Sequence, residues 1–530
     1  MPVSEFCALN PKQVFVREAT GLVRSFSWID ALIIGLAVTG PTYFGIASQI
    51  GFVAPADPGA DFTLSALYGL LFMIPLGLVY YLLSTAMPRS GGDYVWMGRT
   101  LNPVLGFVGG WAMWISFLAL LAAGGAVWGE VVVPVVLATL GYIWNIPYFV
   151  TLGSTMSMTS MFVAGIVLLL VGVLFTSFGP RAYSWMMKVL GVIMILGTIF
   201  VIGILATTSN ATFVNAFNNY GGVNETYAGV IQQAASTGWS YAPVNSAATL
   251  LSIPFGILLF NGFNYSVYVS GEMKDVKKSM LWGTIICLLI CGALDIAGLY
   301  FAMNMIGYQF NQAAYALFAA GKWPWAVAPW LALFLPSVVS NPYLSTFIQI
   351  GWLAFYFWWA AGLFLASSRY VFAFSFDRIL PVAFADINEK LHFPLKATML
   401  NLILAILILY ITVFTTYVGQ VLNTTTIWAI VWAIVAISAI VYPFRKHLQS
   451  TGLIGGKWAY VISGALTFVA MSLTVYYAFT TPAVGPSTLL SDEFLLAILL
   501  SGIGIYAGRY YMLKKRGIDL GLALKEIPPE

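Results

Sequence analysis

The sequence predicts an all-α integral membrane protein with twelve transmembrane helices, and three observations lead to this fold class. Of the 530 residues, 60% are hydrophobic and only 8% are charged, whereas soluble domains carry roughly 25% charged residues. The apolar residues lie in long runs, and a bilayer span needs about 20 of them. The Lys and Arg residues fall on alternate connecting segments. A transmembrane β-barrel would show short alternating segments instead.

Twelve apolar runs are long enough to cross a membrane. They cover residues 28–52, 63–86, 104–138, 159–178, 184–207, 248–271, 279–303, 343–367, 396–417, 425–443, 457–480 and 493–512. The third run is too long for an upright helix, so we expect it to be strongly tilted.

The positions of the basic residues test this count. If the N-terminus is cytoplasmic, all 23 Lys and Arg residues except Lys322 fall in segments on the cytoplasmic side. Basic residues are strongly enriched in cytoplasmic loops, and a wrong number of spans would scramble the asymmetry. The sequence therefore predicts a multi-pass protein of the cell membrane with both termini in the cytoplasm.

The chain is expected to contain two five-helix halves in an inverted repeat, spans 1–5 and 6–10, followed by two additional helices. Long loops follow the fifth and seventh spans, which are corresponding positions of such halves. The expected segments are a cytoplasmic N-terminal segment 1–27, a first repeat 28–207, an outer loop 208–247, a second repeat 248–443, the additional helices 444–512 and a cytoplasmic tail 513–530.

The first span contains a predicted break. Its sequence reads Thr39-Gly40-Pro41-Thr42. Pro41 lacks an amide hydrogen and clashes with the preceding turn, and Gly40 lowers the cost of unwinding. Irregular backbone at membrane depth is tolerated where it is buried in protein or lines a water-filled cavity.

The sixth span contains a second predicted break. It reads Phe260-Asn261-Gly262-Phe263-Asn264, with two polar amides around a glycine. Each break lies in the first span of its half, and paired interruptions are the best sequence indication of a transporter's binding site. At such breaks, free N–H groups favour a carboxylate, and exposed carbonyls favour an ammonium group or a cation. The alternative is that both breaks are tolerated kinks of membrane helices.

Further motifs resemble those of the amino acid–polyamine–organocation transporter superfamily. Residues 87–96, Met-Pro-Arg-Ser-Gly-Gly-Asp-Tyr-Val-Trp, resemble the family's P-x-S-G-G-x-Y pattern. Residues 260–275 resemble F-x-G-F-E followed by G-E-x-K-N-P, and residues 367–397 resemble S-R, D-G-x-L-P and a later P and A. The resemblance implies the five-plus-five fold with substrate held at the unwound parts of spans 1 and 6. Two departures are Asn264, where many members have Glu, and Val276, where Pro is usual.

Transport is expected to be coupled to protons or to proceed by exchange, rather than to be coupled to sodium. By resemblance, a sodium site would need hydroxyls on span 8, but residues 357–362 read Phe-Trp-Trp-Ala-Ala-Gly. The proton-coupling candidates are titratable residues within or at the ends of spans: Lys188, Glu130 and Asp295. Lys188 is compatible with a coupling role or with a snorkelling anchor. Glu130 and Asp295 are compatible with proton transfer or with bonding to a neighbouring helix.

These features predict a secondary transporter that moves a small solute, most simply a neutral amino acid, by alternating access. Transport of a polyamine, another organocation or a nucleobase, and a non-transporting partner subunit, are the alternatives. An enzyme is disfavoured because no paired acids, metal cluster or nucleophile motif occurs. The expected partners are a small-molecule substrate and membrane lipids. No nucleic acid, cofactor or metal is expected, and monomer and homo-oligomer both remain open.

Overall fold

The computed structural model consists of helices joined by turns and loops, with isolated β-bridges between Phe26 and Met273 and between Asn388 and Phe393. It describes residues 21–41, 46, 50–51, 53, 55–220, 225–325, 327–415, 424–449, 452–480, 489–518 and 520.

Within these residues, ten helices are long and apolar enough to cross a membrane. They are α3 (Phe62–Ala86), the continuous α5 (Pro103–Val127) to α6 (Val133–Trp144), α8 (Met158–Ser177), α9 (Pro180–Thr207), the continuous α14 (Val276–Met280) to α15 (Cys287–Ile306), α18 (Pro342–Phe376), α19 (Leu395–Phe414), α21 (Thr424–Val441), α22 (Gly456–Thr480) and α23 (Leu489–Lys515). The helical membrane fold that the sequence predicts is confirmed.

The other two expected spans, the first and the sixth, are interrupted helices. The first begins as α1 (Trp28–Thr39), where Ser27 and Asp30 form a capping box, and it stops at Gly40. The sixth begins with α12 (Ser246–Leu251) and α13 (Ile253–Leu259), and it resumes as a 3-10 helix at Tyr265–Glu272. Both interruptions therefore occur at the predicted positions. These are Gly40-Pro41 in the first span and Gly262, near two asparagines, in the sixth.

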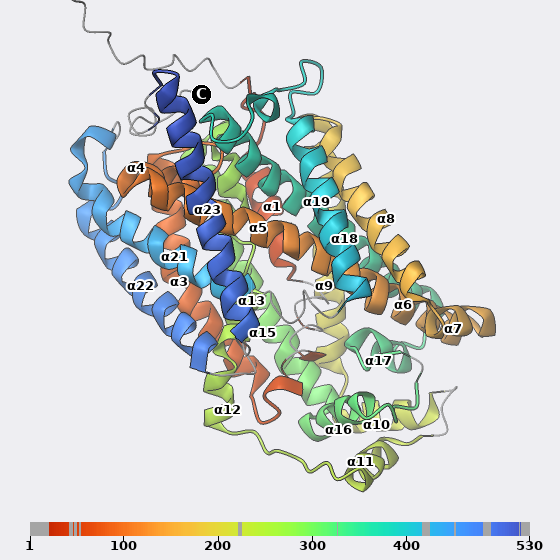
Figure 1. Cartoon of the computed structure of the whole chain (residues 1–530). Helices are drawn as coiled ribbons and strands as arrows, with labels where there is room; N and C mark the ends of the chain where they lie inside the picture. The colour runs from red at the N-terminus through yellow and green to blue at the C-terminus, as the bar shows by residue number, and fades with distance from the viewer. Residues whose placement is uncertain are drawn as a thin grey trace, which may run out of the picture.

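The third span extends further than the sequence suggested. It runs without a gap from Pro103 to Trp144, through a π-helical turn at Trp128–Val132, whereas the expected end was residue 138. At 1.5 Å per residue its 42 residues measure about 63 Å, far more than the roughly 30 Å of a bilayer core. α5 accordingly crosses the bundle obliquely (Figure 1).

The two ends of the bundle differ in structure. One end, here called the outer end, carries α10 (Asn210–Asn219), α11 (Tyr227–Ser236) and α16 (Tyr308–Ala319), at the bottom of Figure 1. α17 (Leu331–Val338) contacts this layer through an aromatic cluster of Phe213, Phe217, Phe310 and Phe334. The opposite end, here called the inner end, carries α4 (Asp93–Thr100). α7 (Pro147–Ser154) follows α6.

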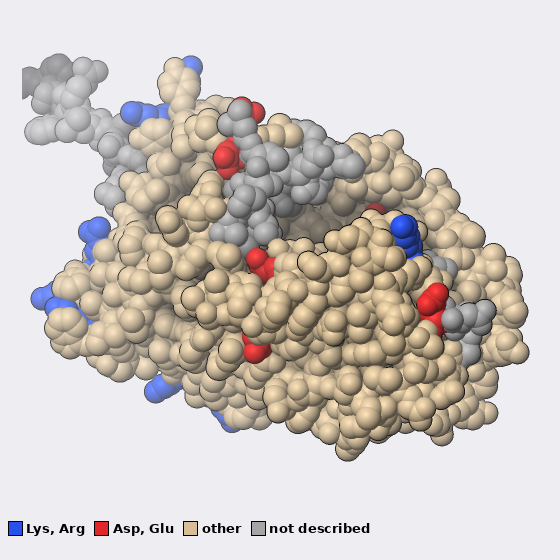
Figure 2. Space-filling model, turned by 90° about the horizontal axis from the view of Figure 1, so that it is seen from below, with Lys and Arg blue, Asp and Glu red and all other residues tan. Residues whose placement is uncertain are grey.

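Charge is distributed unequally over the outer end. Viewed from this side, Asp and Glu side chains are visible over the central part of the surface, whereas most visible Lys and Arg side chains lie along one margin (Figure 2). The assignment of the inner end to the cytoplasm and the inverted repeat of two halves stay predictions.

Candidate functional site

The two breaks lie directly against each other. Gly262 has a φ of +113°, and a Cβ atom built on it would lie 2.6 Å from the backbone nitrogen of Thr39 and 2.6 Å from the carbonyl carbon of Val38. A side chain therefore fits neither the backbone conformation nor the space, and only glycine permits this contact. Tertiary packing thus joins the interrupted parts of spans 1 and 6 into one region.

The end of α1 at this contact is well defined. Gly40 adopts the left-handed conformation (φ 68°, ψ 56°), and its amide donates to the carbonyl oxygen of Leu36 at 2.9 Å. The hydroxyl of Thr39 donates to the carbonyl oxygen of Gly35 at 2.8 Å. Pro41 follows in a turn, and Thr42, also predicted as a binding residue, lies outside the described residues.

The predicted residues of the second break are all buried. Phe260 and Phe263 have no exposed surface, Gly262 is buried, and Asn261 and Asn264 are 7% and 1% exposed. The Asn261 side chain lies beside the hydroxyl of Tyr265. The Asn264 side chain lies beside the hydroxyl of Tyr80, and its carbonyl oxygen has no hydrogen-bond partner among the described residues.

Helix ends converge at this region. α1 ends at Thr39 and α13 ends at Leu259, so the carbonyl ends of both helices face the same region. The last carbonyls of a helix lack intrahelical partners and carry a partial negative charge. The chain resumes as a 3-10 helix at Tyr265, whose amide donates to the carbonyl oxygen of Gly262 at 3.0 Å. The region therefore offers carbonyl acceptors suited to an ammonium group, and the buried side-chain amides of Asn261 and Asn264 carry N–H donors suited to a carboxylate.

Asp295 is a buried acid at the level of the first break. On the same face of α15, the Sγ of Cys287 lies 2.8 Å from where a Cβ of Gly35 would stand, below the break. Further along that face, Gly298 packs against Ile46, beyond the break. Asp295 lies between these two contacts, one turn from Cys291, which lies beside Thr39.

The Asp295 carboxyl is isolated. It is fully buried, and neither oxygen has a hydrogen-bond partner among the described residues. An isolated buried charge costs several kcal/mol because water is lost without compensation. Sequence analysis placed Asp295 only in the outer third of a span, and the tertiary structure sets it beside the break.

Lys188 is paired at the inner end. Its Nζ lies 2.8 Å from Oδ1 of Asp30 and donates to the hydroxyl of Ser184 at 2.9 Å, and Ser184 in turn donates to Asp30 at 2.5 Å. The Lys188 side chain is 36% exposed. This pair joins the start of α1 to α9, away from the contact of Gly262 with Thr39.

Glu130 lies in the π-helical turn of the third span and is exposed on the surface of the chain. A π-helical turn inside an α-helix is rare and is frequent at functional sites. The structure does not bring Glu130, Lys188 and Asp295 together: they lie on three different elements, the π-helical turn at Trp128–Val132, α9 and α15.

The described face of α18 toward α1 offers no hydroxyl at the level of the break. Gly362 packs there against Val38, with 2.8 Å between an ideal Cβ and a methyl carbon of Val38. Trp358 lies against Gly191 of α9, and Trp359 lies against Gly124 of α5. Indole rings and a glycine thus occupy the positions where the family resemblance would place sodium-binding hydroxyls.

The inner end contains three buried polar clusters that sequence reasoning did not identify as functional. In the first, Asp93 accepts hydrogen bonds from the hydroxyls of Tyr80 (2.9 Å), Tyr268 (3.0 Å) and Tyr370. Burial raises the pKa of Asp93 to about 6, against the effect of the three hydroxyls, which favour the carboxylate. The cluster ties α3, α4, span 6 and α18 together.

The second cluster is a bidentate ion pair. The Nε and Nη2 atoms of Arg369 contact the two carboxylate oxygens of Glu272 at 2.7 and 2.9 Å, and both side chains are at most 1% exposed. The carbonyl oxygen of Glu272 accepts from the amides of Ser25 (3.0 Å) and Phe26 (3.1 Å). The segment before α1 is thereby attached to the end of span 6.

The third cluster joins α4 to the end of α18. Arg99 contacts Asp377 at 2.7 Å, and the hydroxyl of Tyr94 donates to the same oxygen at 2.6 Å. A signal for these clusters was present, because Asp93, Glu272 and Arg369 are charged residues within the motifs quoted above. Their pairing across distant segments could not be read from the motifs alone.

Polar groups in the outer half are arranged differently. Asn311 and Tyr315 of α16 and Trp352 of α18 are buried, yet their side-chain polar atoms have no hydrogen-bond partner in the described part of the chain. Buried polar groups are normally paired with protein or with water. These polar atoms have no partner in the described structure, whereas the charged side chains of the inner clusters pair with one another.

Comparison with known proteins agrees with this geometry. The amino acid permease family matches residues 26–504. The glutamate/serine transporter AimA of Bacillus subtilis (strain 168) is 22% identical over 501 residues, covering 91% of this chain and 82% of that protein. The methylthioribose transporter of the same organism is 22% identical over 392 residues, covering 73% and 75%. An uncharacterized protein 399 of Sulfolobus islandicus rod-shaped virus 1 is 21% identical over 379 residues, covering 71% and 70%.

The family match spans both breaks, the buried clusters of the inner end and all but the last part of α23. The chain belongs to the amino acid permease family, and it is a multi-pass membrane protein and a secondary transporter rather than an enzyme.

Proposed function

We propose that this transporter carries a neutral amino acid, bound where the breaks of spans 1 and 6 meet. The observation that supports the proposal most directly is the contact of Gly262 with Thr39. Carbonyl ends of α1 and α13 converge there and favour an ammonium group, and the side-chain amides of Asn261 and Asn264 offer N–H donors to a carboxylate. A zwitterion satisfies both, and one relative is named a glutamate/serine transporter.

The inner end is cytoplasmic in this proposal, as the distribution of Lys and Arg predicts. The buried clusters around Asp93, Glu272 and Asp377 then form the inner gate, which must separate when substrate leaves toward the cytoplasm. Binding near the middle of the membrane and alternate opening of the two ends is the expected mechanism for two inverted halves.

Proton coupling through Asp295 is the second part of the proposal. A carboxyl group that is buried without a partner favours its protonated form, and it can lose the proton when water or substrate reaches it. Asp295 lies at the level of the first break, so a proton on this carboxyl would be held next to the proposed substrate site. Lys188 is already paired with Asp30, and Glu130 is exposed, so they are the second and third candidates.

Asp295 also favours one competing substrate class. An unpaired carboxylate beside the break would attract an organic cation, such as a polyamine, through its charge. The two substrate classes differ in their demand on this residue, because a zwitterion needs Asp295 only for coupling, whereas a cation needs it for binding.

The test is thermal stabilisation of the purified protein by the neutral amino acids, by polyamines and by methylthioribose, with and without sodium. A ligand that binds only the folded state raises its stability by mass action. We expect stabilisation by a neutral amino acid, unaffected by sodium and retained in Asp295→Asn. Stabilisation by a polyamine that is lost in Asp295→Asn would replace the proposed substrate class with an organic cation.

A further inference from the structure

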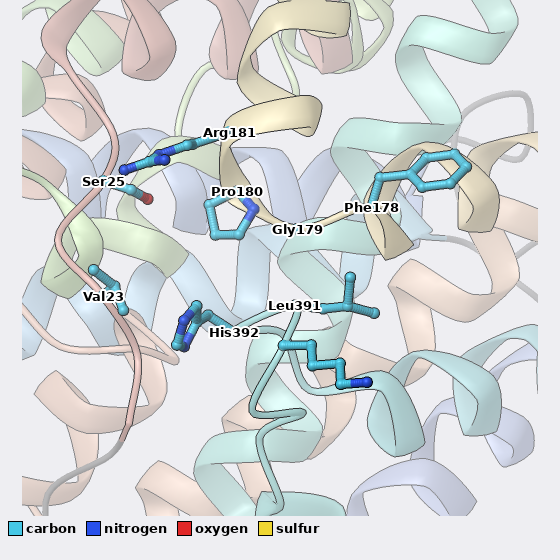
Figure 3. A pocket seen from close by; sticks show the side chains of 9 residues that line it. Val23, Ser25, Phe178, Gly179, Pro180, Arg181, Leu391 and His392 are labelled. Atoms are coloured by element: carbon cyan, nitrogen blue, oxygen red, sulfur yellow. The ribbon is translucent and has the colours of Figure 1, made fainter.

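A pocket of about 400 Å³ opens at the inner end, apart from the two breaks and the buried clusters. Three separate segments form it (Figure 3). They are Val23 and Ser25 before α1, residues 178–181 at the junction of α8 with the start of α9, and residues 390–392 between α18 and α19. The transport mechanism described above makes no use of this pocket.

The lining of the pocket is basic. Arg181, Lys390 and His392 line it, and none of its lining residues is acidic. No salt bridge joins these three side chains to any described acid, whereas the nearby Lys396 pairs with Asp386 at 2.5 Å. In Figure 3 the Arg181 side chain points toward Ser25, with His392 on the opposite side near Val23. Three basic side chains around one pocket, with no acidic partner among the described residues, are suited to an anion.

The backbone around the pocket adds to this preference. α9 is 28 residues long and begins at Pro180, with Gly179 as its N-cap, so its positive dipole end opens at the pocket wall. The hydroxyl of Ser25 is buried and has no hydrogen-bond partner among the described residues. An anion with several acceptor oxygens would use the helix end and the hydroxyl together with the basic side chains.

The basic loop is held in a fixed shape. The side chain of Asn388 accepts from the amides of Lys390 and Leu391, both at 3.0 Å, and the amide of Asn388 donates to the carbonyl oxygen of Phe393 at 3.1 Å. The carbonyl oxygen of Leu391 lies 2.8 Å from where a Cβ of Gly179 would stand, so the loop packs directly on the start of α9. The pocket is therefore a built feature rather than a gap between mobile side chains.

We infer that this pocket binds a phosphate-bearing anion. Phosphate is the shared chemistry of a free anion and of an anionic lipid headgroup, and basic pockets between membrane helices at the cytoplasmic side bind such headgroups. Phe178 at the rim is 53% exposed and Trp185 on the next turns of α9 is 68% exposed. Exposed aromatic residues at helix ends are typical of the membrane interface, and they place the pocket at headgroup depth.

Occupancy of the pocket would act on the inner gate. Ser25 lines the pocket, and its amide donates to the carbonyl oxygen of Glu272, whose carboxylate pairs with Arg369. An anion that holds Ser25 and Arg181 together fixes the segment before α1 against span 6. The bound anion thus stabilises the state in which the inner end is closed, whichever solute the transporter carries.

The experiment compares the full chain in nanodiscs of phosphatidylcholine alone, in the same nanodiscs with added inorganic phosphate, and in nanodiscs containing phosphatidylglycerol. The pocket variant is Arg181→Ala/Lys390→Ala. The control variant is Lys277→Ala/Lys446→Ala, which removes two exposed basic residues of the same end outside the pocket. The readouts are the thermal midpoint and the binding affinity for each anion.

We expect one of the anions to stabilise the wild type and the control. We expect the same anion to bind the pocket variant at least about tenfold more weakly. A response to phosphatidylglycerol alone identifies a lipid headgroup, and a response to inorganic phosphate identifies a free anion. Equal responses of the pocket variant and the control to both anions would overturn the inference. Equal midpoints of the two variants in phosphatidylcholine alone verify that the pocket variant folds.

Discussion

Gly262 of span 6 stands against the backbone of Thr39 in span 1, so closely that a Cβ atom at Gly262 would lie 2.6 Å from the Thr39 nitrogen. The contact joins two breaks that lie far apart in the sequence. It leaves no room for a side chain, and it orients the carbonyl ends of α1 and α13 toward a common region. The first two predictions concern the residues around it.

Gly262→Ala is expected to reduce uptake at least tenfold while the protein still inserts into the membrane. The added Cβ clashes with the α1 backbone, and a φ of +113° is strained for any L-residue, so the two breaks must separate. Uptake normalised to the amount of folded protein measures the effect. The control is Gly203→Ala in α9, where nothing lies within 4 Å of the added atom. Equal uptake by both variants would place the substrate elsewhere.

Asp295→Asn is expected to abolish the dependence of uptake on an imposed proton gradient and to leave counterflow exchange active. The amide has nearly the shape of the carboxyl but cannot carry the proton, and no described hydrogen bond is lost because both oxygens are unpartnered. Proteoliposomes with inside and outside buffers of different pH provide the measurement, with Glu130→Gln as the matched control. If uptake by Asp295→Asn still responded to the proton gradient, Asp295 would not be the coupling residue.

Lys188→Ala is expected to slow uptake several-fold at every pH without changing the slope of its pH profile. The substitution removes the ion pair with Asp30 and loosens the start of α1 from α9, and a half-exposed pair contributes only about 1 kcal/mol. Uptake by the variant and by the wild type is measured in the same proteoliposomes over a range of pH. A flattened pH profile in Lys188→Ala would instead assign the coupling proton to Lys188.

Tyr370→Phe is expected to destabilise the protein more at pH 8 than at pH 5. Burial raises the pKa of Asp93 to about 6, above its ordinary value. Holding the ionised carboxylate in the folded state therefore costs free energy. This cost is absent below about pH 4, where the group is protonated in both states, and complete above about pH 6. The Tyr370 hydroxyl offsets part of that cost by donating to the carboxylate, and a hydrogen bond to a charged group contributes about 1.5–3 kcal/mol.

The thermal midpoint of Tyr370→Phe relative to wild type, measured at both pH values, checks this prediction. Tyr410→Phe is the control, because the Tyr410 side chain on α19 is 53% exposed. A loss of stability that is the same at pH 5 and pH 8 would show that the hydroxyl does not support the charged form of Asp93.

Glu272→Gln and Arg369→Gln are each expected to cost about 3–5 kcal/mol, because each leaves the charged partner buried without its counter-ion. The double variant is expected to cost less than the sum of the two. The free energies follow from chemical denaturation in detergent, and labelling from the cytoplasmic side is expected to rise as the inner end opens. Additive losses would mean that the pair does not act as a unit.

Much of the fold followed from local sequence properties. Ten of the expected spans are single long helices, and the interruptions of the other two fall at Gly40-Pro41 and around Gly262, because unwinding costs least at glycine and proline. Helix ends were less accurate, as the third span shows: it continues to Trp144 because no proline lies between 138 and 144, and it ends where Asn145 adopts the left-handed conformation.

The sequence by itself determined the membrane-spanning class, the breaks and the asymmetry of basic residues, since hydropathy, glycine, proline and charge are properties of short stretches of chain. Only the tertiary structure decided that Thr39 meets Gly262, that Lys188 is paired with Asp30, that Asp295 is isolated beside the first break, and that Asp93 gathers three tyrosines. Each of these relationships joins residues from different helices, and their distances depend on how whole helices pack, which no local pattern specifies.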